Sequence, residues 1–372
     1  MNCPQHILMT ADTVGGVWTY ALELARGLTQ HGVRVSLATM GTGPSRSQRA
    51  EALDAGAELY SGNYKLEWMD LPWSDVDAAG QWLLNLERQI RPDLIHLNGY
   101  VHGSLRWQAP SIVVAHSCVY SWWNAVHEAS PPAQDWTAYR RRVRAGLRGA
   151  NHVVAVSNAM RSEIERWYGR LHSIQTIYNS RDEKAFRPSR KEDFVLSTGR
   201  VWDAAKNLSA LDEAARYTRW PVYVAGESQH PEGGKKALHT GIPLGTLSAN
   251  QLNPLFACAG IYALPALYEP FGLSVLEAAL SGCALVLGDI PSLRELWREA
   301  AVFVAPRDSE AIALAINALV CKPEAREEFG RRARARAFTY TRERMIQGYL
   351  QAYTLAGSRF EASRRLEVSC AS

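Results

Sequence analysis

Residues Ile261–Gly282 read IYALPALYEPFGLSVLEAALSG, and this segment is the most informative about the fold. Its apolar start, IYAL, predicts a buried strand that ends at Pro265. The loop that follows carries Glu269, and the pattern predicts a helix that begins at about Gly272 and ends just before Gly282. A strand, a loop and a helix in this order form a βα unit, which is the building block of parallel sheets.

The same alternation of short apolar runs and helical patterns extends through both halves of the chain. It predicts an amphipathic helix over Val17–His31 and a polar, charged linker at 180–192. Strands are predicted at His6–Thr10, Arg34–Thr39, Leu94–Leu97, Ile112–His116, Val153–Val156, Phe194–Thr198, Val222–Ala225, Ile242–Leu244, Ile261–Leu264, Ala284–Leu287 and Val302–Val304. Because 372 residues are more than one ordinary core holds, we expect two doubly wound α/β domains.

The predicted domain boundaries follow from this pattern. Residues 1–185 form an N-terminal Rossmann-like domain and residues 186–340 a C-terminal one. A last helix, 341–357, crosses back to the first domain, and the polar segment 358–372 is a loose tail. Ligands of open α/β sheets bind beyond the carboxyl ends of the strands. The site residues are therefore expected in loops that follow strands in both halves and face one cleft.

Composition excludes several classes of protein. A net charge of +4 is too small and too dispersed to indicate nucleic-acid binding. The six cysteines contain no C-x-x-C pair, which argues against a structural zinc site and fits free thiols in a reducing compartment. The N-terminus lacks the pattern of a signal peptide, and no apolar run approaches the ~18–20 residues that span a bilayer. A cytoplasmic protein is expected, with membrane contact only from the inner face.

Two carboxylates mark the loop and helix of the opening stretch. Glu269 and Glu277 are close enough along the chain to contact two sugar rings of one nucleotide-sugar, because a carboxylate accepts hydrogen bonds from vicinal hydroxyls. The backbone N–H groups of Phe271, Gly272 and Leu273 lie at the predicted helix N-terminus and offer donors to ligand oxygens. Without the surrounding motif, such a pair of glutamates would be a helix-start acid and a solvated one.

The segment EPFGLSVLEA, with its Glu-x7-Glu spacing, resembles the signature of the retaining GT-B glycosyltransferases of family GT4. The resemblance implies two Rossmann-like domains, the first for the acceptor and the second for most of the donor. It also implies that Glu269 lies against the transferred sugar and that Glu277 binds the ribose of the nucleotide. A UDP-sugar is the expected donor, and no metal is expected.

A second element, GRVWDAAKN from Gly199, is similar to the family's G-R-x5-K motif. In that family the arginine and lysine, here Arg200 and Lys206, neutralise the donor diphosphate. The physics agrees, since glycosyl transfer builds charge on the leaving diphosphate and two cations can stabilise it. Taken alone, an arginine and a lysine after a strand would be ordinary surface charges.

Two weaker elements lie in the first half. Gly15 and Gly16 follow the first strand, where the family uses a Gly-Gly loop near the donor phosphate; the absence of G-x-G-x-x-G argues against a dinucleotide site. His116 ends the strand IVVAH, where related enzymes often have a histidine near the transferred sugar. A satisfied core histidine is the alternative for His116.

Some segments depart from the family pattern. Ser180 and Arg181 stand where the linker motif N-G-V-D has glycine and valine, and Ser228 replaces the second glycine of a Gly-x-Gly. Pro291 and Ser292 stand where two glycines are common. These departures surround the linker and the nucleotide, so they leave the base and the sugar of the donor open.

Two charged segments need separate interpretation. Asp75 and Asp77 could be taken for a metal-binding DxD, but with Ser74 they suit a helix start better. Residues Arg140–Arg148 form a basic helix with Trp122, Trp123 and Trp136 upstream. A solvated face is the simplest explanation of that helix; contact with anionic lipid or an acidic acceptor is the functional one.

The resemblance implies transfer of a hexose-type sugar from a nucleotide-sugar to a sugar or lipid-linked acceptor, in polysaccharide or glycoconjugate synthesis. Retention is expected by front-face attack. A nucleotide-sugar epimerase or phosphorylase on the same fold is the alternative enzyme class, and a non-catalytic sugar-nucleotide-binding subunit is the third hypothesis.

Overall fold

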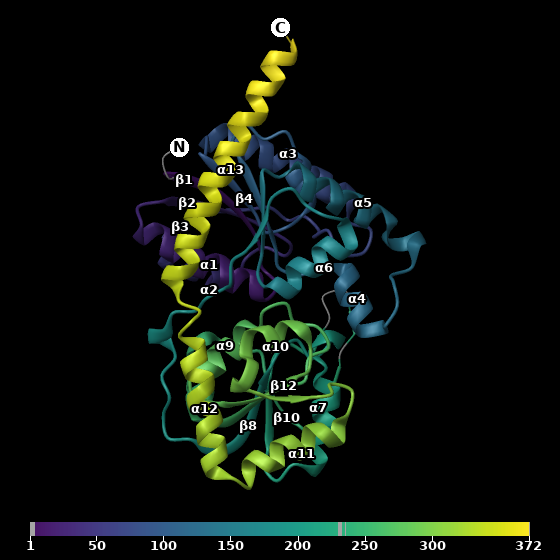
Figure 1. Ribbon diagram of the computed structural model, residues 1–372, viewed down its shortest axis with the longest axis vertical. Coiled ribbons are helices and arrows are strands. Elements are labelled where there is room, and N and C mark those ends of the chain that lie inside the picture. The colour runs from purple at the N-terminus through teal and green to yellow at the C-terminus, as the bar shows by residue number, and fades with distance from the viewer. Residues whose placement is uncertain (1–3, 230–232, 235, 372) are drawn as a thin grey trace. The chain divides into compact units, whose positions relative to one another are not determined.

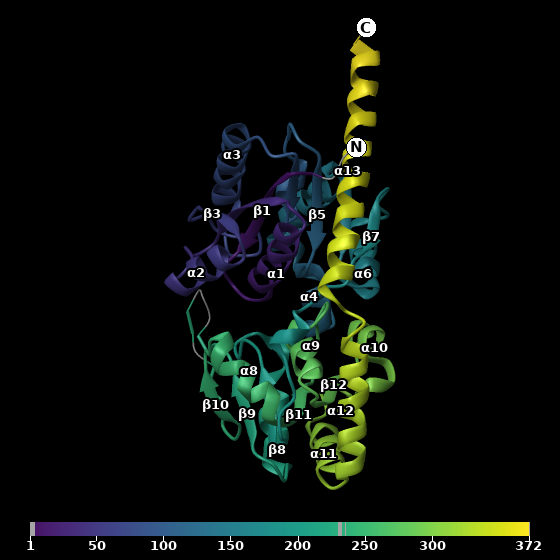
Figure 2. The ribbon, with the colours of Figure 1, turned by 90° about the vertical axis from the view of Figure 1, so that its left-hand side faces the viewer.

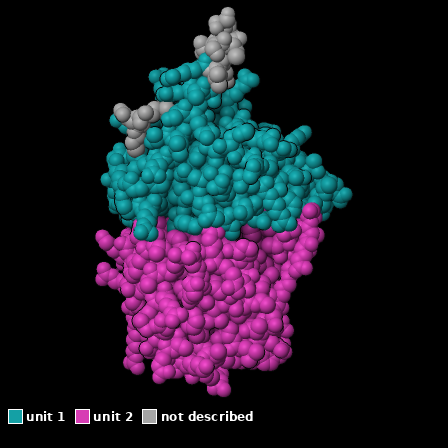
Figure 3. All heavy atoms as spheres, in the orientation of Figure 1, with its two compact units in different colours: residues 1–120, 131–179, 342–372 teal, residues 121–130, 180–341 magenta. Residues whose placement is uncertain are grey.

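The computed structural model describes residues 4–229, 233–234 and 236–371. The chain divides into two compact units, which Figure 3 shows in different colours. Unit 1 comprises residues 1–120, 131–179 and 342–372, and unit 2 comprises residues 121–130 and 180–341. Each unit is an α/β domain built around its own parallel sheet.

Unit 1 is built on a sheet in the strand order β3-β2-β1-β4-β5-β6-β7, with every neighbouring pair parallel. Strands β1 to β4 of this sheet are labelled in Figure 1. The strands are β1 (His6–Asp12), β2 (Arg34–Met40), β3 (Ala57–Ser61), β4 (Leu94–Leu97), β5 (Ser111–Ala115), β6 (His152–Ala155) and β7 (Ile174–Thr176). The central strands β4 and β5 are buried along their whole length, as expected for strands with both faces covered.

The helices of unit 1 follow the strands in alternation. They are α1 (Gly16–Gln30), α2 (Arg46–Asp54), α3 (Trp73–Ile90), α5 (Ala133–Gly149), α6 (Asn158–Tyr168) and, from the end of the chain, α13 (Arg342–Ala371). Helix α13 packs beside α1 and against β5 and β6 (Figure 2). The buried Arg342–Glu23 ion pair at 2.6 Å joins α13 to α1. The last segment of the chain thereby completes the first domain.

Unit 2 has a six-stranded parallel sheet in the order β10-β9-β8-β11-β12-β13. Its strands are β8 (Glu192–Thr198), β9 (Val222–Ala225), β10 (Ile242–Gly245), β11 (Ala259–Leu264), β12 (Ala284–Gly288) and β13 (Val302–Val304). Its helices are α7 (Leu208–Ala214), α8 (Ala249–Cys258), α9 (Leu273–Leu280), α10 (Pro291–Trp297), α11 (Ser309–Val320) and α12 (Pro323–Ala337). Strand β11, which opens the segment most informative about the fold, lies at the centre and is buried throughout.

The strands predicted from apolar runs are all present, with ends within two residues of the prediction. Two further strands, β3 and β7, were missed. Both lie at edges of the unit 1 sheet, and their sequences AELYS and IQT are only partly buried. Edge strands lack the continuous apolar run of a buried strand, so their pattern resembles that of a loop.

The observed division of the chain differs from the predicted boundaries. The change from unit 1 to unit 2 falls at 179/180 rather than 185/186, and residues 121–130 join unit 2 although they lie early in the sequence. Residues 121–127 belong to helix α4 (Val119–His127).

The predicted loose tail from residue 358 is instead a continuation of α13 as far as Ala371. No glycine or proline follows Gly357, and Glu361 and Arg365 form an i,i+4 ion pair, so nothing ends the helix there.

None of the helices in the described part of the chain is long and apolar enough to cross a membrane.

Candidate active site

The loop between β11 and α9 presents Glu269 at the carboxyl edge of the unit 2 sheet. The side chain is almost buried, and its residue is 8% exposed. The hydroxyl of Ser292 donates a 2.6 Å hydrogen bond to the backbone carbonyl of Glu269, which fixes the loop. Gly272 ends the loop with φ +83, a conformation that L side chains rarely adopt, and acts as the N-cap of α9. The glycine therefore lets the chain turn sharply from loop to helix.

The helix N-terminus lies close to where the sequence predicted it. Leu273 is the first residue of α9, so its N–H is one of those that lack an acceptor within the helix. Gly272 is the cap, and Phe271 lies one residue outside, with its ring buried against Tyr340 at 5.7 Å. Phe271 thus anchors the loop by packing, while the first-turn N–H groups are the ones available to a ligand.

Lys206 is brought to Glu269 by hydrogen bonds between two loops. Leu267 donates its N–H to the carbonyl of Ala205 at 2.8 Å, and the Asn207 carboxamide donates to the carbonyl of Pro265, also at 2.8 Å. These bonds hold the short helix Ala204–Lys206 against the β11–α9 loop. The Lys206 ammonium forms an ion pair with the Glu269 carboxylate. The two motifs, far apart in sequence, therefore form one site.

Arg200 lies beside this pair and is held by Asp203, which sequence reasoning did not single out. One carboxylate oxygen of Asp203 accepts a 2.7 Å bond from the Arg200 guanidinium, which also lies over the Trp202 ring. Asp203 is 5% exposed. Burial alone would raise the pKa of Asp203, but the charges of Arg200 and Lys206 outweigh it and hold that pKa below its usual range. Asp203 therefore stays ionised and fixes the arginine.

The other oxygen of Asp203 is held by Trp122. The indole N–H of Trp122 and the backbone N–H of Ala205 each donate to Oδ1 at 3.0 Å. Trp122 belongs to unit 2 through the segment 121–130, and Arg307 donates to the carbonyls of Ala125 and Val126 at the end of that segment. From the sequence, Trp122 was interpreted together with the basic helix Arg140–Arg148. The structure corrects this, since the indole bonds to Asp203.

Glu277 forms a second ion pair that the sequence only hinted at. Its carboxylate lies 2.7 Å from Nε of Arg181, with side-chain exposures of 12% and 14%. The guanidinium also lies over the ring of Phe186, at 5.3 Å from its centroid. Arg181 is one of the departures from the family pattern, so the sequence marked it as unusual. Its pairing with Glu277 could not be read from the sequence. Lys206, Arg200 and Arg181 are each paired with a carboxylate, so the net charge of these three ion pairs is close to zero.

In unit 1 the Gly-Gly loop connects β1 to α1. Gly15 has φ +97 and caps α1, whose first residue is Gly16. The loop is held by its neighbours, because the N–H of Val14 donates to Asp12 at 3.0 Å and the Gln48 side chain donates to the carbonyl of Thr13, also at 3.0 Å. Both glycines therefore lie at the carboxyl end of a central strand and at a helix N-terminus, as predicted.

His116 follows β5 directly and is half-buried. Its Nε2 lies 2.9 Å from the side-chain oxygen of Asn98, and its ring meets the Tyr20 ring edge-on at 4.4 Å. Burial lowers the pKa of His116 to about 3, so the ring is neutral at physiological pH. Asn98, which follows β4, was not predicted. Within unit 1 the structure places His116 and the glycine loop at the same edge of the sheet.

The acidic segment at Asp75 and Asp77 has a clear structural role. Helix α3 starts at Trp73 with Pro72 as its cap, two residues before the predicted start, and Asp75 lies in its first turn. Asp77 is paired with Arg142 of α5, whose guanidinium hydrogen bond holds the pKa of that carboxyl below its usual range. Asp77 therefore belongs to an ion pair between α3 and α5.

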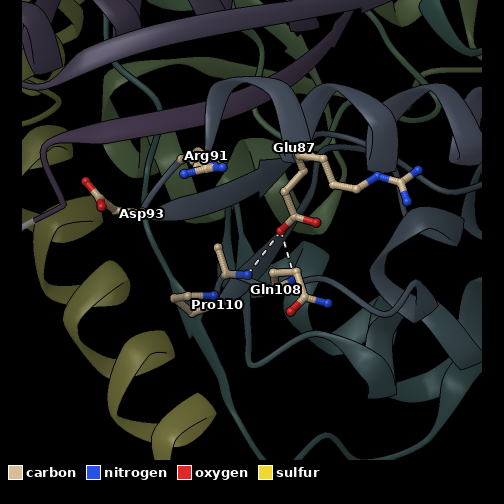
Figure 4. Close-up of a pocket in the computed structure, with 8 residues that line it drawn as sticks. Glu87, Arg91, Asp93, Gln108 and Pro110 are labelled. Carbon is tan, nitrogen blue, oxygen red and sulfur yellow. Dashed lines mark hydrogen bonds between the residues drawn. The ribbon is translucent and has the colours of Figure 1, made fainter.

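A separate pocket of about 640 Å³ lies at the opposite edge of the unit 1 sheet, before β4 and β5. Figure 4 shows Glu87, Arg91, Asp93, Gln108 and Pro110 around it. The Glu87 carboxylate accepts hydrogen bonds from the N–H groups of Gln108 and Ala109 at 2.8 and 3.0 Å. These bonds satisfy the acid and brace the loop, and the pocket shares no residue with the predicted site.

The chain matches two sequence families that together span residues 14–336. Residues 14–184 match Glycosyltransferase Family 4, and residues 179–336 match Glycosyl transferases group 1. A glycogen synthase of Mycobacterium tuberculosis is 26% identical over 365 residues, covering 87% of this chain and 86% of that protein. A D-inositol 3-phosphate glycosyltransferase of Gordonia bronchialis is 25% identical over 401 residues, with coverages of 94% and 85%.

Solved structures show the same architecture. Sucrose-phosphate synthase from Thermosynechococcus elongatus superposes with a TM-score of 0.76 at 18% identity, covering 98% of this chain and all of that one. Anabaena HepE in complex with UDP-glucose gives a TM-score of 0.74 at 16% identity, with coverages of 94% and 99%. The two Rossmann-like α/β domains thus define a protein of the GT-B fold. The chain belongs to the GT4-type glycosyltransferases and is a transferase.

Proposed function

We propose that this enzyme transfers a hexose-type sugar from a nucleotide-sugar, with UDP as the nucleotide, to a hydroxyl of a sugar or lipid-linked acceptor. The observation that carries the proposal is the cluster of Lys206, Arg200, Glu269 and Glu277 at the carboxyl edge of one sheet. The relatives include a glycogen synthase and an O-antigen mannosyltransferase, which supports a role in polysaccharide or glycoconjugate synthesis.

The cations of the cluster suit a diphosphate leaving group. As the bond between the anomeric carbon and the phosphate oxygen breaks, negative charge develops on the diphosphate. Arg200 and Lys206 would bind that charge, and because both are already fixed by carboxylates, little reorganisation is needed. Glu269 would accept hydrogen bonds from hydroxyls of the transferred sugar, and Glu277 from the ribose.

For the transfer itself we propose front-face attack with retention. The acceptor hydroxyl forms its bond to the anomeric carbon on the face that the diphosphate leaves, and the hydroxyl proton passes to an oxygen of the departing phosphate. The charge that a divalent ion would otherwise neutralise falls to Arg200 and Lys206, and we propose that the reaction needs no metal. UDP is supported by the structures of HepE in complex with UDP and with UDP-glucose.

Thermal unfolding with UDP-, GDP-, ADP- and dTDP-sugars, each with and without a chelator, tests the donor. A ligand at ~100 times its Kd adds about 2.7 kcal/mol of stability. We expect an increase in Tm with UDP-sugars that the chelator leaves unchanged. An increase with a different nucleotide would assign the donor to that base. Loss of the shift with chelator would contradict the metal-free site, and no shift with any donor would contradict the proposed donor site itself.

We further propose that the basic helix α5 meets an anionic surface, such as an acidic lipid headgroup. Arg142 is engaged by Asp77 and Trp73, but Arg141, Arg144 and Arg148 are exposed at i, i+3 and i+7 spacing on one side of the helix. Cosedimentation with vesicles that contain phosphatidylglycerol tests this. We expect binding that weakens with salt and is lost when the three arginines are replaced by glutamine; equal binding by that variant would refute it.

A further inference from the structure

The Asn98 carboxamide is held in one orientation by the end of β1. Its backbone N–H donates to the hydroxyl of Thr10 at 2.9 Å, and its Nδ2 donates to the backbone carbonyl of Thr10 at 2.7 Å. A carbonyl oxygen can only accept, so the nitrogen of the carboxamide must face Thr10. The carboxamide oxygen therefore points the other way, toward His96 on β4 and His116 at the end of the neighbouring strand β5.

That oxygen determines which nitrogen of His116 carries the proton. Asn98 Oδ1 lies 2.9 Å from Nε2 of His116. Because Oδ1 can only accept, Nε2 must be the protonated nitrogen of the ring. The ring is neutral, since burial lowers the pKa of His116 to about 3. Nδ1 therefore carries a lone pair, and among residues 4–229, 233–234 and 236–371 it has no hydrogen-bond partner.

A second layer keeps this arrangement rigid. His96 is fully buried on β4, with Nε2 at 3.2 Å from Asn98 Oδ1 and Nδ1 at 2.9 Å from the hydroxyl of Tyr353 on α13. Burial also lowers the pKa of His96 to about 3, so no positive charge competes for Asn98. The Tyr20 ring of α1 packs edge-on against His116. Residues of β1, α1, β4 and α13 thus hold the amide and both rings.

We propose that Asn98 is a positioning residue that fixes His116 as the Nε2–H tautomer, so that Nδ1 accepts a hydrogen bond from a hydroxyl of the bound sugar. The proposal rests on the proposed glycosyl transfer and deepens it. A neutral ring with a free lone pair recognises a hydroxyl, which can donate. It does not suit a phosphate or carboxylate oxygen, which can only accept. His116 is then a sugar-binding group with no part in proton transfer.

Nitrogen-15 NMR of the full chain labelled at histidine tests the tautomer without any substrate. The His116 signal is assigned by its loss in His116→Gln. We expect one nitrogen with the shift of a protonated ring nitrogen, coupled in the Nε2–H pattern, and this pattern unchanged between pH 6 and 8. A proton on Nδ1, or a charged ring in that range, would overturn the proposal. Since no donor is needed, this result stands apart from any failure to find donor binding.

Two substitutions at Asn98 test whether this residue orients His116 or only stabilises the fold. In Asn98→Ala we expect mixed tautomers and a roughly 10- to 100-fold lower kcat/KM, the effect of one lost hydrogen bond in the site. Asn98→Asp still accepts from Nε2–H, so the tautomer should persist. Its charge should raise the pKa of His116, which also faces His96 and Tyr20, and add an ionisation to the pH profile of kcat/KM.

Ser36→Ala is the matched control. Ser36 lies in the first half of β2 of the same sheet, and the substitution removes its 2.9 Å hydrogen bond with the buried His6 of β1. We expect it to lower Tm without changing the His116 spectrum or kcat/KM. If Asn98→Ala behaved in the same way, losing only Tm, Asn98 would be a structural residue and the proposal would fail. If it failed to fold, Asn98→Asp alone would decide through its pH profile.

Discussion

Lys206→Ala is expected to lower kcat by about 100- to 1,000-fold, the loss typical of removing one group that stabilises charge in a transition state. The ammonium lies at the junction of the two motif loops and has a fixed partner in Glu269. In the proposed mechanism it stabilises the diphosphate only as the bond to the sugar breaks, so kcat should fall more than KM rises. Nucleotide release from the donor that gives the thermal shift measures both constants.

The loss of Lys206 also leaves the nearly buried Glu269 without its cation, which lowers stability. The double variant Lys206→Ala/Glu269→Gln removes the unpaired charge and should recover most of the Tm without recovering activity. Lys322→Ala removes an exposed lysine at the start of α12 and serves as the control. Near-normal turnover in Lys206→Ala, at a Tm that shows the protein folded, would remove this residue from the mechanism.

Glu269→Gln is expected to lower kcat/KM by roughly 10- to 100-fold. The amide has the shape of the acid, and the Ser292 bond to the backbone carbonyl of residue 269 remains, so the loop should keep its course. The substitution removes the charge that holds Lys206 and one of the acceptors offered to the sugar hydroxyls. Both effects weaken binding of the reacting part of the donor.

Binding of the free nucleotide distinguishes a role of Glu269 in sugar binding from a role in nucleotide binding. Binding of the free nucleotide diphosphate, measured by calorimetry, should change little in Glu269→Gln, because the proposal assigns this acid to the sugar. Glu310→Gln, an exposed acid in the first turn of α11, is the control and should leave both measurements unchanged. A large loss of nucleotide affinity with unchanged kcat in Glu269→Gln would assign the residue to the nucleotide instead.

The architecture of both sheets could be predicted because their central strands are buried on both faces and appear as apolar runs. Strand β11, with every residue buried, is the strongest case. The edge strands β3 and β7 could not be recognised, since they are only partly buried and lack the continuous apolar run of a buried strand. The assignment of 121–130 to unit 2 was also beyond prediction, because it depends on contacts of Trp122 and Arg307 that no local pattern encodes.

The site was predicted one member at a time, and its pairing was not. The motifs placed Glu269, Glu277, Arg200 and Lys206 after the correct strands. That Lys206 pairs with Glu269, and Arg181 with Glu277, depends on how the loops meet in three dimensions. Asn98 carries no motif, and only the geometry around His116 reveals it. An asparagine directly after a central strand is the sequence feature that could have suggested it.

The central claim is that the cation–carboxylate cluster of unit 2 binds the nucleotide diphosphate of the donor. A crystal structure of the enzyme with the nucleotide that gives the largest thermal shift tests it most directly. We predict diphosphate oxygens within hydrogen-bond distance of the Arg200 guanidinium and the Lys206 ammonium, with the ribose hydroxyls on Glu277. A nucleotide bound elsewhere on the chain, with no contact to Arg200 or Lys206, would contradict the account.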